Sequence, residues 1–404
     1  MHKRSLGLTL FGAVAIIVAA CGGGATPTPG TSAVTPSQPA TSASAPAESP
    51  SGGAASPSAP STSALKIGVV TDIGTLNDKN FNEYSFKGAE AGAAAIGAQP
   101  PTSIVPASAA EYASSIKSFV DQKFDVIVTV GFNLASATVQ AAHDNPNTWF
   151  VGVDQSPICV TADGLPDSSF ACAGDAKTLL PKYVSVHFAE DQAGYLAGII
   201  AAGASTKGEV GAIGGTSVCA PCVRYIQGYE LGAKSVKADI KVVSAYVTND
   251  FSAAAFQDQA GGKLFAEGFL AKNKNVDVLF QVAGLTGNGL IDAACAAKIN
   301  AIGVDVDQHT SYPASAPCIL TSAEKHLATS VSDEIQAIAG GTAKGGLTFF
   351  NATNDGIGVS PFYDAASKIG PDTQAKLDEA LAAMKAGTLK TCPAKCGTLP
   401  VSQP

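Results

Sequence analysis

The feature that most constrains the fold is a regular alternation of short apolar runs and Ala-rich stretches from residue 65 onward. The runs have the length of a strand and are rich in Val and Ile, and five of the seven end at Gly or Asp. They are residues 66–72, 125–132, 148–154, 209–215, 241–247, 276–284 and 300–307. The stretches between them have the apolar spacing of helices. Buried strands that alternate with helices predict parallel sheets with right-handed crossovers, which is an α/β fold.

A short sequence motif that occurs twice indicates two lobes. Residues 151–155 (VGVDQ) close one half of the series, and residues 302–308 (IGVDVDQ) close the next. The 404 residues are enough for two packed domains. We therefore expect two doubly wound parallel-sheet lobes joined by a hinge. Ligands of open α/β sheets bind at the carboxyl ends of the strands, so the sequence predicts a ligand cleft between the lobes.

The N-terminus has the pattern of an export signal. Two basic residues, Lys3 and Arg4, precede a short apolar stretch that ends just before Cys21. A stretch this short is typical of a signal peptide, because a transmembrane helix needs about 20 apolar residues. Residues 18–21 (VAAC) resemble a bacterial lipobox, whose cysteine is lipidated. We expect residues 1–20 to be a lipoprotein signal peptide; the alternative is an ordinary signal peptide with an incidental cysteine.

Residues 21–64 are almost wholly Gly, Ala, Ser, Thr and Pro. Such a segment buries too little apolar surface to offset its ordering entropy, so we expect a disordered linker. It would hold a folded domain away from the membrane on a lipid tether.

Charge and motif content exclude several classes of protein. The formal net charge is −8, from 33 acidic and 25 basic side chains, which argues against binding to nucleic acid. The five histidines form no H-E-x-x-H pattern, and no G-x-S-x-G sequence is present. We therefore predict no enzyme activity, no catalytic residue, no cofactor and no bound metal.

The nine cysteines indicate an exported protein, because the chain shows no zinc pattern. Cys21 stands alone and the other eight fall into local pairs. Eight cysteines allow 105 connectivities; we favour local pairing, as Cys159–Cys172, Cys219–Cys222, Cys295–Cys318 and Cys392–Cys396. Cys219 and Cys222 have the C-x-x-C spacing of redox centres, but a structural disulfide is favoured in an exported chain.

The loop after the first apolar run carries polar residues at the expected cleft. Asp72 ends the run, and Asn77 or Asp78 is suited to cap the following helix. Alternating Asp and Asn residues there also resemble an EF-hand loop. Glu83 and Ala89 stand where that loop needs Gly and Glu, so calcium is rejected.

Two later segments leave alternatives open. Residues 284–289 (GLTGNG) match neither G-x-G-x-x-G nor G-K-[ST], so a glycine turn close to a neutral ligand is favoured over a phosphate cradle. Asp305 and Asp307 alternate at the end of an apolar run and are expected to share a face. They could form a metal pair without a third ligand, hold a sugar diol through one carboxylate, or cap a strand end.

Seven segments in the same order resemble the basic membrane protein family, the substrate-binding lipoproteins of ABC importers that include bacterial purine-nucleoside receptors. The resemblance covers residues 65 to about 384. The segments are residues 70–82 (VTDIG…NDKNFN), 150–155 (FVGVDQ), 191–198 (DQAGYLAG), 211–229 (GAIGG…R…GY), 282–289 (VAGLTGNG), 303–308 (GVDVDQ) and 321–325 (TSAEK).

The resemblance implies a type I periplasmic-binding-protein fold that encloses a nucleoside between its lobes. By position, Phe81 and Phe256 would stack on the two faces of the base. Asp72 and Asn133 would read the edge of the base. Stacking of an aromatic side chain on a base contributes about 1–3 kcal/mol.

The same resemblance assigns the ribose. Asp305 and Lys325 would hold its hydroxyls, and Gly284 would line the pocket. We expect Lys325 to keep the Asp305 carboxylate ionised.

These observations lead to one expectation and three rivals. We expect an extracytoplasmic lipoprotein, anchored to the bacterial cell membrane and usually monomeric in this class, that delivers a nucleoside to an ABC permease. The rivals are the same fold with a sugar or a vitamin-like heterocycle, an extracellular thiol–disulfide protein that uses Cys219 and Cys222, and a surface antigen. The expected domains are a signal peptide (1–20), a linker (21–64), an N-terminal lobe (65–185, completed by roughly 320–345), a C-terminal lobe (186–319, completed by roughly 346–390) and a C-terminal tail with a local disulfide (391–404).

Overall fold

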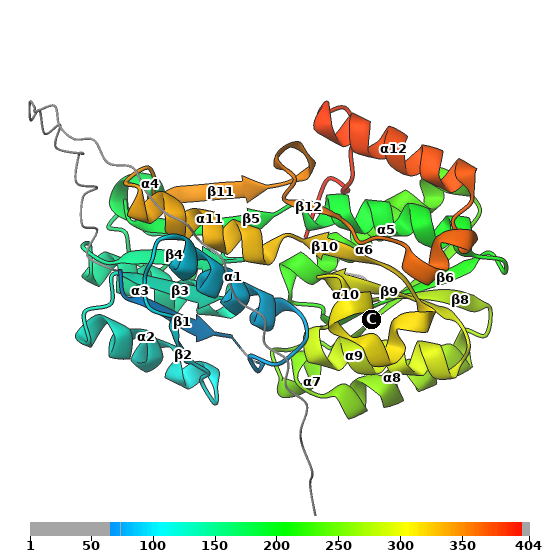
Figure 1. Cartoon of the computed structure of the whole chain (residues 1–404), viewed down its shortest axis with the longest axis horizontal. Coiled ribbons are helices and arrows are strands. Elements are labelled where there is room, and N and C mark those ends of the chain that lie inside the picture. Colours follow the sequence, from blue (N-terminus) through cyan, green and yellow to red (C-terminus); the bar gives the residue numbers. More distant parts are fainter. Residues whose placement is uncertain (1–64, 73, 398–404) are drawn as a thin grey trace, which may run out of the picture. The chain divides into compact units, whose positions relative to one another are not determined.

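The computed structural model describes residues 65–72 and 74–397, which form two α/β lobes (Figure 1). The N-terminal lobe holds a six-stranded parallel sheet with the order β11-β5-β4-β3-β1-β2. Its strands are β1 (Ile67–Thr71), β2 (Thr102–Ile104), β3 (Val126–Val130), β4 (Trp149–Val153), β5 (Tyr183–Phe188) and β11 (Gly346–Phe350). Its helices are α1 (Phe81–Ala95), α2 (Tyr112–Asp121), α3 (Ala135–Asp144), α4 (Ala176–Leu179) and α11 (Leu327–Ala339).

The C-terminal lobe holds a second six-stranded sheet with the order β12-β10-β9-β8-β6-β7, in which only β12 is antiparallel. Its strands are β6 (Glu209–Thr216), β7 (Lys241–Thr248), β8 (Val276–Val282), β9 (Asn300–Asp305), β10 (Ile319–Lys325) and β12 (Ile357–Val359). Its helices are α5 (Glu190–Ala204), α6 (Ala220–Val236), α7 (Ala253–Phe256), α8 (Gln259–Lys272), α9 (Gly284–Ala296), α10 (Gln308–Ser311) and α12 (Pro371–Lys385). Short 3-10 helices are η1 (Ala109–Glu111), η2 (Phe132–Leu134), η3 (Pro313–Cys318), η4 (Ala352–Asn354) and η5 (Tyr363–Lys368).

Alternate residues of each strand enter different cores, because successive side chains of a strand point to opposite faces of the sheet. In β3, Val126 and Val128 pack in the core that contains α1 and α11, whereas Ile127 packs in the core that contains α2 and α3. In β8, Phe280 packs with α5 and α6, whereas Leu279 packs with α8 and α9. Both sheets are therefore covered on both faces, which confirms the predicted doubly wound α/β fold.

The chain passes between the lobes at three places: from β5 to α5, from β10 to α11, and from β11 to β12 (Figure 1). Sheet membership differs here from the expected lobe boundaries. β10 was expected in the N-terminal lobe but joins the C-terminal sheet, and β11 was expected in the C-terminal lobe but pairs with β5. The last residues of β5 also stay in the N-terminal sheet, beyond the expected boundary at residue 185.

All four expected disulfides are present: Cys159–Cys172, Cys219–Cys222, Cys295–Cys318 and Cys392–Cys396. The expected signal peptide, Cys21 and the linker lie outside the described residues. Within residues 65–72 and 74–397, no helix has both the length and the apolar character needed to cross a membrane.

Candidate functional site

A cavity of about 80 Å³ is lined by residues of both lobes. The N-terminal lobe lines it with Asp72, Asp78, Phe81, Asn82, Gly131, Phe132 and Asp154. The C-terminal lobe lines it with Cys219, Pro221, Cys222, Tyr225, Phe256, Val282, Ala283, Gly284, Asp305 and Lys325.

Six of the seven residues expected to bind the ligand line this cavity; they are Asp72, Phe81, Phe256, Gly284, Asp305 and Lys325. Asn133 does not. Its backbone N–H and its Nδ2 each donate to the Asp72 carboxylate at 3.2 Å, and the Tyr112 hydroxyl also donates to that carboxylate. Asn133 therefore positions Asp72 in this structure.

Phe81 is the first residue of α1, and Asp78 fixes where that helix begins. The Asp78 carboxylate accepts hydrogen bonds from the backbone N–H groups of Asn80 (2.8 Å), Asn82 (2.9 Å) and Glu83 (3.1 Å). It satisfies N–H groups that have no partner inside the helix, so Asp78 is the cap of the two candidates, Asn77 and Asp78, that the sequence offered. Burial nevertheless raises the pKa of Asp78 to about 6, against the lowering effect of these hydrogen bonds.

Phe256 ends α7 and lies against two glycines. A Cβ atom on Gly215 of β6 would come within 2.6 Å of the Phe256 ring. Gly284 begins α9 with φ +52°, a left-handed conformation that glycine adopts without strain. The ring therefore occupies its place because position 215 carries no side chain.

Charged side chains meet at the wall of the cavity nearest the crossovers. The buried Lys325 Nζ, at the end of β10, lies 2.5 Å from Asp154 Oδ2, 3.1 Å from Glu190 Oε1 and 3.9 Å from Asp305 Oδ1. Arg224 Nε donates to Glu190 Oε2 at 2.6 Å. We call these five residues the hinge cluster. It holds three carboxyl groups against two cations and takes Asp154 from the N-terminal lobe.

The hinge cluster gives its carboxyl groups different proton affinities. Burial opposes ionisation of Glu190, but Arg224 and Lys325 outweigh it and lower its pKa to about 2. Burial raises the pKa of Asp305 to about 7, and the more distant Lys325 offsets this only in part. Lys325 therefore favours ionisation of Asp305, as expected, but does not restore its ordinary pKa. Burial raises the pKa of Asp154 as well, although Lys325 Nζ lies 2.5 Å from its carboxylate.

Arg224 reaches Glu190 because α5 and α6 lie unusually close together. A Cβ atom on Gly194 of α5 would come within 2.1 Å of the Tyr225 carbonyl oxygen, and one on Gly228 of α6 within 2.1 Å of the Asp191 carbonyl oxygen. Only glycine allows the backbones to approach to this distance. The two helix N-termini, with Glu190 and Arg224, are thereby held side by side.

Asp305 and Asp307 do not share a face, which corrects the expectation drawn from their spacing. β9 ends at Asp305, whose φ is +63°, so the strand alternation stops there. Asp307 instead caps α10 by accepting from the N–H of His309 at 3.1 Å, and it accepts from the Tyr363 hydroxyl at 2.6 Å. The capping alternative therefore holds for Asp307, and Asp305 alone lines the cavity.

The glycines of residues 284–289 serve packing more than ligand approach. Gly284 alone among them lines the cavity. A Cβ atom on Gly287 would lie 1.8 Å from Gln281 Oε1, and one on Gly289 would lie 1.9 Å from the Gln259 carbonyl oxygen. Most of this glycine pattern therefore allows α9 to pack against β8 and α8.

Sequence reasoning missed several residues of the cavity wall: Asp154, Tyr225, Phe132 and the Cys219–Cys222 disulfide. The sequence could have indicated Asp154, because it occupies the same position in the VGVDQ motif that Asp305 occupies in the related motif of the other lobe. Tyr225 donates to Asp305 Oδ1 at 3.2 Å, a contact between residues 80 apart in the chain that no local pattern predicts.

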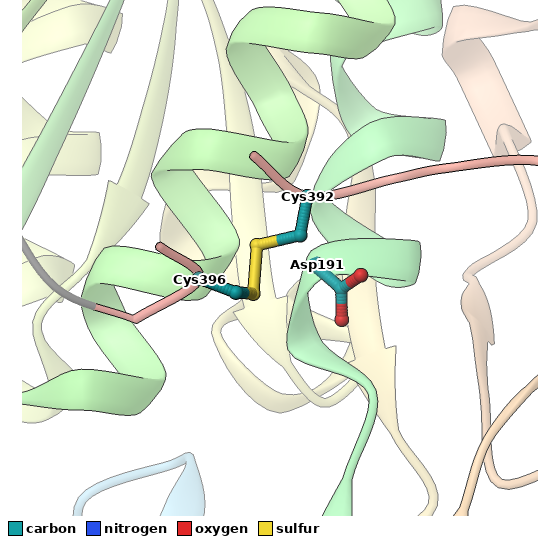
Figure 2. Close-up of side chains that lie close together, drawn as sticks. All are labelled: Asp191, Cys392 and Cys396. Atoms are coloured by element: carbon teal, nitrogen blue, oxygen red, sulfur yellow. A yellow bond between two sulfur atoms is a disulfide. The ribbon is translucent and has the colours of Figure 1, made fainter. Parts of the chain in front are cut away.

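Within residues 65–72 and 74–397, one group of three side chains has the spacing of metal ligands. It comprises Asp191, Cys392 and Cys396, whose ligand atoms lie within 4.8 Å of one another. Figure 2 shows the Asp191 carboxylate beside the bond that joins the two sulfur atoms. Metal ions bind cysteine as the thiolate, so the disulfide removes two of the three ligands and we assign no metal to this group.

Comparison with known proteins agrees with this geometry. Residues 65–382 match the Bmp family, described as ABC transporter substrate-binding protein PnrA-like. The chain is 30% identical over 332 residues to the ABC transporter nucleoside-binding protein BmpA of Lactococcus lactis subsp. cremoris, covering 76% of this chain and 86% of that protein. It is 25% identical to an uncharacterized lipoprotein of Pyrococcus abyssi, covering 95% of this chain and 85% of that protein.

Solved structures share the fold. An ABC transporter solute-binding protein of Aeropyrum pernix K1 superposes with a TM-score of 0.68 at 21% identity, covering 81% of this chain and 92% of that one. The resemblance inferred from the seven segments is confirmed: the chain belongs to the Bmp family of PnrA-like ABC transporter substrate-binding proteins.

Proposed function

We propose that this protein encloses a nucleoside, preferably a purine nucleoside, between its lobes and delivers it to an ABC importer. The observation that carries the proposal is that Phe81 and Phe256, from different lobes, line one cavity together with Asp72, Asp305 and Lys325. Two aromatic side chains from different lobes suit the two faces of a planar base, and the polar groups suit its edge and its sugar. The relative in Lactococcus lactis carries the name of a nucleoside-binding protein.

The charges of the cavity favour a neutral ligand. Four aspartates line it, namely Asp72, Asp78, Asp154 and Asp305, against one cation, Lys325. Lys325 is already paired with Asp154 and Glu190. A phosphate group would meet excess negative charge in a buried site, so nucleotides should bind more weakly than nucleosides.

Contacts between the lobes support a clamp that closes on its ligand. Asn288 Nδ2 of the C-terminal lobe donates to the Asp78 carbonyl oxygen at 3.1 Å, and Ser311 Oγ donates to the Lys79 carbonyl oxygen at 2.8 Å. These hydrogen bonds form beside the cavity and would break when the lobes open. Closure about the three crossovers would present one defined surface to a permease.

We further propose that Cys21 carries a lipid and that the protein acts outside the cytoplasm. The VAAC sequence supports this, as does the relative of Pyrococcus abyssi, which is named a lipoprotein. Burial argues against the rival redox function, because Cys219 and Cys222 are 2% and 4% exposed and a thiol reagent needs access to the sulfur.

Calorimetry tests the proposal. The chain without its signal peptide and with Cys21→Ser is titrated with adenosine, guanosine, cytidine, adenine, ribose and AMP. We expect a nucleoside to bind with the highest affinity. Phe81→Ala should weaken its binding about 5- to 150-fold, which corresponds to the loss of one stacked ring.

The matched control is Phe170→Ala, because Phe170 is 77% exposed and does not line the cavity. This variant should bind like the parent chain. Ribose binding as tightly as nucleosides would favour the sugar-receptor rival. No binding across the panel, after removal of any co-purified ligand, would contradict the proposal.

A further inference from the structure

A pair of phenylalanine rings joins the two lobes beside the cavity. Phe132 begins η2 of the N-terminal lobe, and Phe251 belongs to the loop between β7 and α7 of the C-terminal lobe. The centroids of the two rings lie 5.1 Å apart, and their planes make an angle of 48°. Aromatic rings at this distance attract each other beyond the effect of their buried area. The pair therefore favours the arrangement in which the lobes are together.

The two rings belong to different hollows of the surface. Phe132 lines the cavity, whereas Phe251 lines a separate groove. The other described residues that line this groove, among them Tyr112 and Asn133, all belong to the N-terminal lobe. Gln140 of the groove is exposed, so the groove opens to solvent. The pair Phe132–Phe251 therefore stands between the cavity and an open groove.

The rest of the partition between cavity and groove belongs to one lobe. Asp72 lines the cavity, and its carboxylate accepts hydrogen bonds from Tyr112 and Asn133, which line the groove. These three residues lie in the N-terminal lobe and hold one another in place. Phe251 instead moves with the C-terminal lobe. Separation of the lobes would withdraw Phe251 and leave the cavity continuous with the groove.

Hydrogen bonds give the loop that carries Phe251 a defined shape. The N–H of Ser217 donates to the carbonyl oxygen of Thr248 at 3.2 Å, and the Ser217 hydroxyl donates to Asn249 Oδ1 at 3.0 Å. The N–H of Asp250 donates to Thr248 Oγ1 at 2.9 Å. Phe251 is 45% exposed, so these bonds, more than burial of its ring, hold it against Phe132.

The same segment continues into α7, which ends at Phe256. The Thr286 hydroxyl of α9 donates to the carbonyl oxygen of Ala254 at 3.0 Å, which ties α7 to the C-terminal lobe. Phe256 lines the cavity from this lobe. A base between Phe81 and Phe256 and the contact of Phe251 with Phe132 both require the lobes to be together. Each contact therefore favours the other.

We propose that Phe251 is a gate for the ligand. With the lobes together, its contact with Phe132 separates the cavity from the groove, and the ligand leaves through the groove once this contact breaks. The inference rests on the proposed function, because it takes a nucleoside as the enclosed ligand. It extends that function by assigning a residue that sets how long the ligand stays bound without contacting it.

Dissociation kinetics test the gate. Radiolabelled adenosine, guanosine and cytidine are bound to the chain used for calorimetry, and release is followed after addition of excess unlabelled nucleoside. Phe251→Ala should raise the dissociation rate constant about 3- to 10-fold, because a ring contact of the closed lobes is lost. The factor should be the same for each base, since Phe251 does not line the cavity. Phe251→Tyr keeps the ring and should stay within about twofold of the parent chain.

Phe349→Ala is the matched control. Phe349 is 41% exposed, and its ring lies 5.2 Å from the ring of His187, but both residues belong to the N-terminal sheet. This variant loses a similar ring contact within one lobe and should release nucleosides at the parent rate. In a Phe132→Ala background, Phe251→Ala should add less than about twofold, because its partner ring is already absent.

The outcomes separate the gate from the proposed function. The parent chain binding nucleosides with an unchanged dissociation rate in Phe251→Ala would overturn the gate and leave the proposed function standing. The same holds if the acceleration differs between bases, persists in full without the Phe132 ring, or is matched by Phe349→Ala. If the parent chain binds none of the nucleosides, both proposals fall together.

Discussion

Two regions of the cavity wall hold their carboxyl groups by different means. On one side, Asp72 and Asp78 accept hydrogen bonds from neutral groups of their own lobe, such as Asn133 and the backbone at the start of α1. On the other side, the hinge cluster joins carboxyl groups of both lobes through Lys325 and Arg224.

This difference separates side chains that recognise the ligand from side chains that couple the two lobes. Neutral hydrogen bonds within a lobe fix an acceptor without involving the other lobe. Buried ion pairs are costly to form and more costly to leave half-made, so the hinge cluster ties stability to the arrangement of the lobes. Changes at Asp72 should act mainly on ligand affinity, whereas changes in the hinge cluster should act on stability and on its pH dependence.

Replacement of Lys325, the cation at the centre of the hinge cluster, should have the largest effect on stability. Lys325→Met leaves Asp154 and Glu190 buried beside an apolar side chain, and we expect a loss of about 3–5 kcal/mol in the free energy of unfolding. Chemical denaturation measures this loss. The control is Lys117→Met, because Lys117 pairs with Asp121 at 2.6 Å and both side chains are exposed, by 69% and 59%.

The control should lose at most about 1 kcal/mol, since exposed ion pairs contribute little. If the two variants were equally stable, the hinge cluster would not differ energetically from a surface pair.

The pH dependence of stability tests the electrostatics of the hinge cluster. The pKa of Asp305 is raised to about 7 in the folded protein, from 3.8 in an unperturbed chain. Between these values the folded state holds a proton that the unfolded state has lost. The contribution of Asp305 to the free energy of unfolding therefore falls as pH rises through this window, by roughly 1.4 kcal/mol per pH unit, and is constant above it.

Asp305→Asn removes this slope, so the difference in the free energy of unfolding between the parent chain and the variant should change between pH 4 and pH 7. Asp78 and Glu324, whose pKa values are raised to about 6 and about 7, titrate in both proteins and cancel in that difference. A difference independent of pH would show that Asp305 is ionised throughout the window.

Sequence reasoning was most successful where a local pattern determines the structure. Strand-length runs with a buried pattern predicted β1, β3 and β8, because consecutive buried residues leave few alternatives in an α/β chain. It was wrong about which sheet β10 and β11 join. That choice depends on the crossovers and not on the strands themselves.

The residues of the site also divide into those that were predicted from the sequence and those that were not. Phe81, Phe256 and Asp305 were assigned through the family resemblance, and the structure brings them to one cavity. The pair Arg224–Glu190 was missed because its residues lie 34 positions apart and meet only through the close approach of α5 and α6. The altered pKa of Asp305 was missed because distances to Lys325 within a buried cluster cannot be read from residue spacing.

The smallest expected effect separates the two aspartates of the D-x-D sequence. Asp307 caps α10 and accepts from Tyr363, away from the cavity. Asp307→Ala should therefore lower the free energy of unfolding by about 0.5–2 kcal/mol, as expected for the loss of a cap, and leave nucleoside affinity within about twofold of the parent chain. Asp305→Ala should weaken nucleoside binding about tenfold or more, because it removes a buried hydrogen-bonding group from the ligand. Denaturation and calorimetry on both variants measure the two effects, and equal losses of affinity would mean that Asp307 also reaches the ligand when the lobes close.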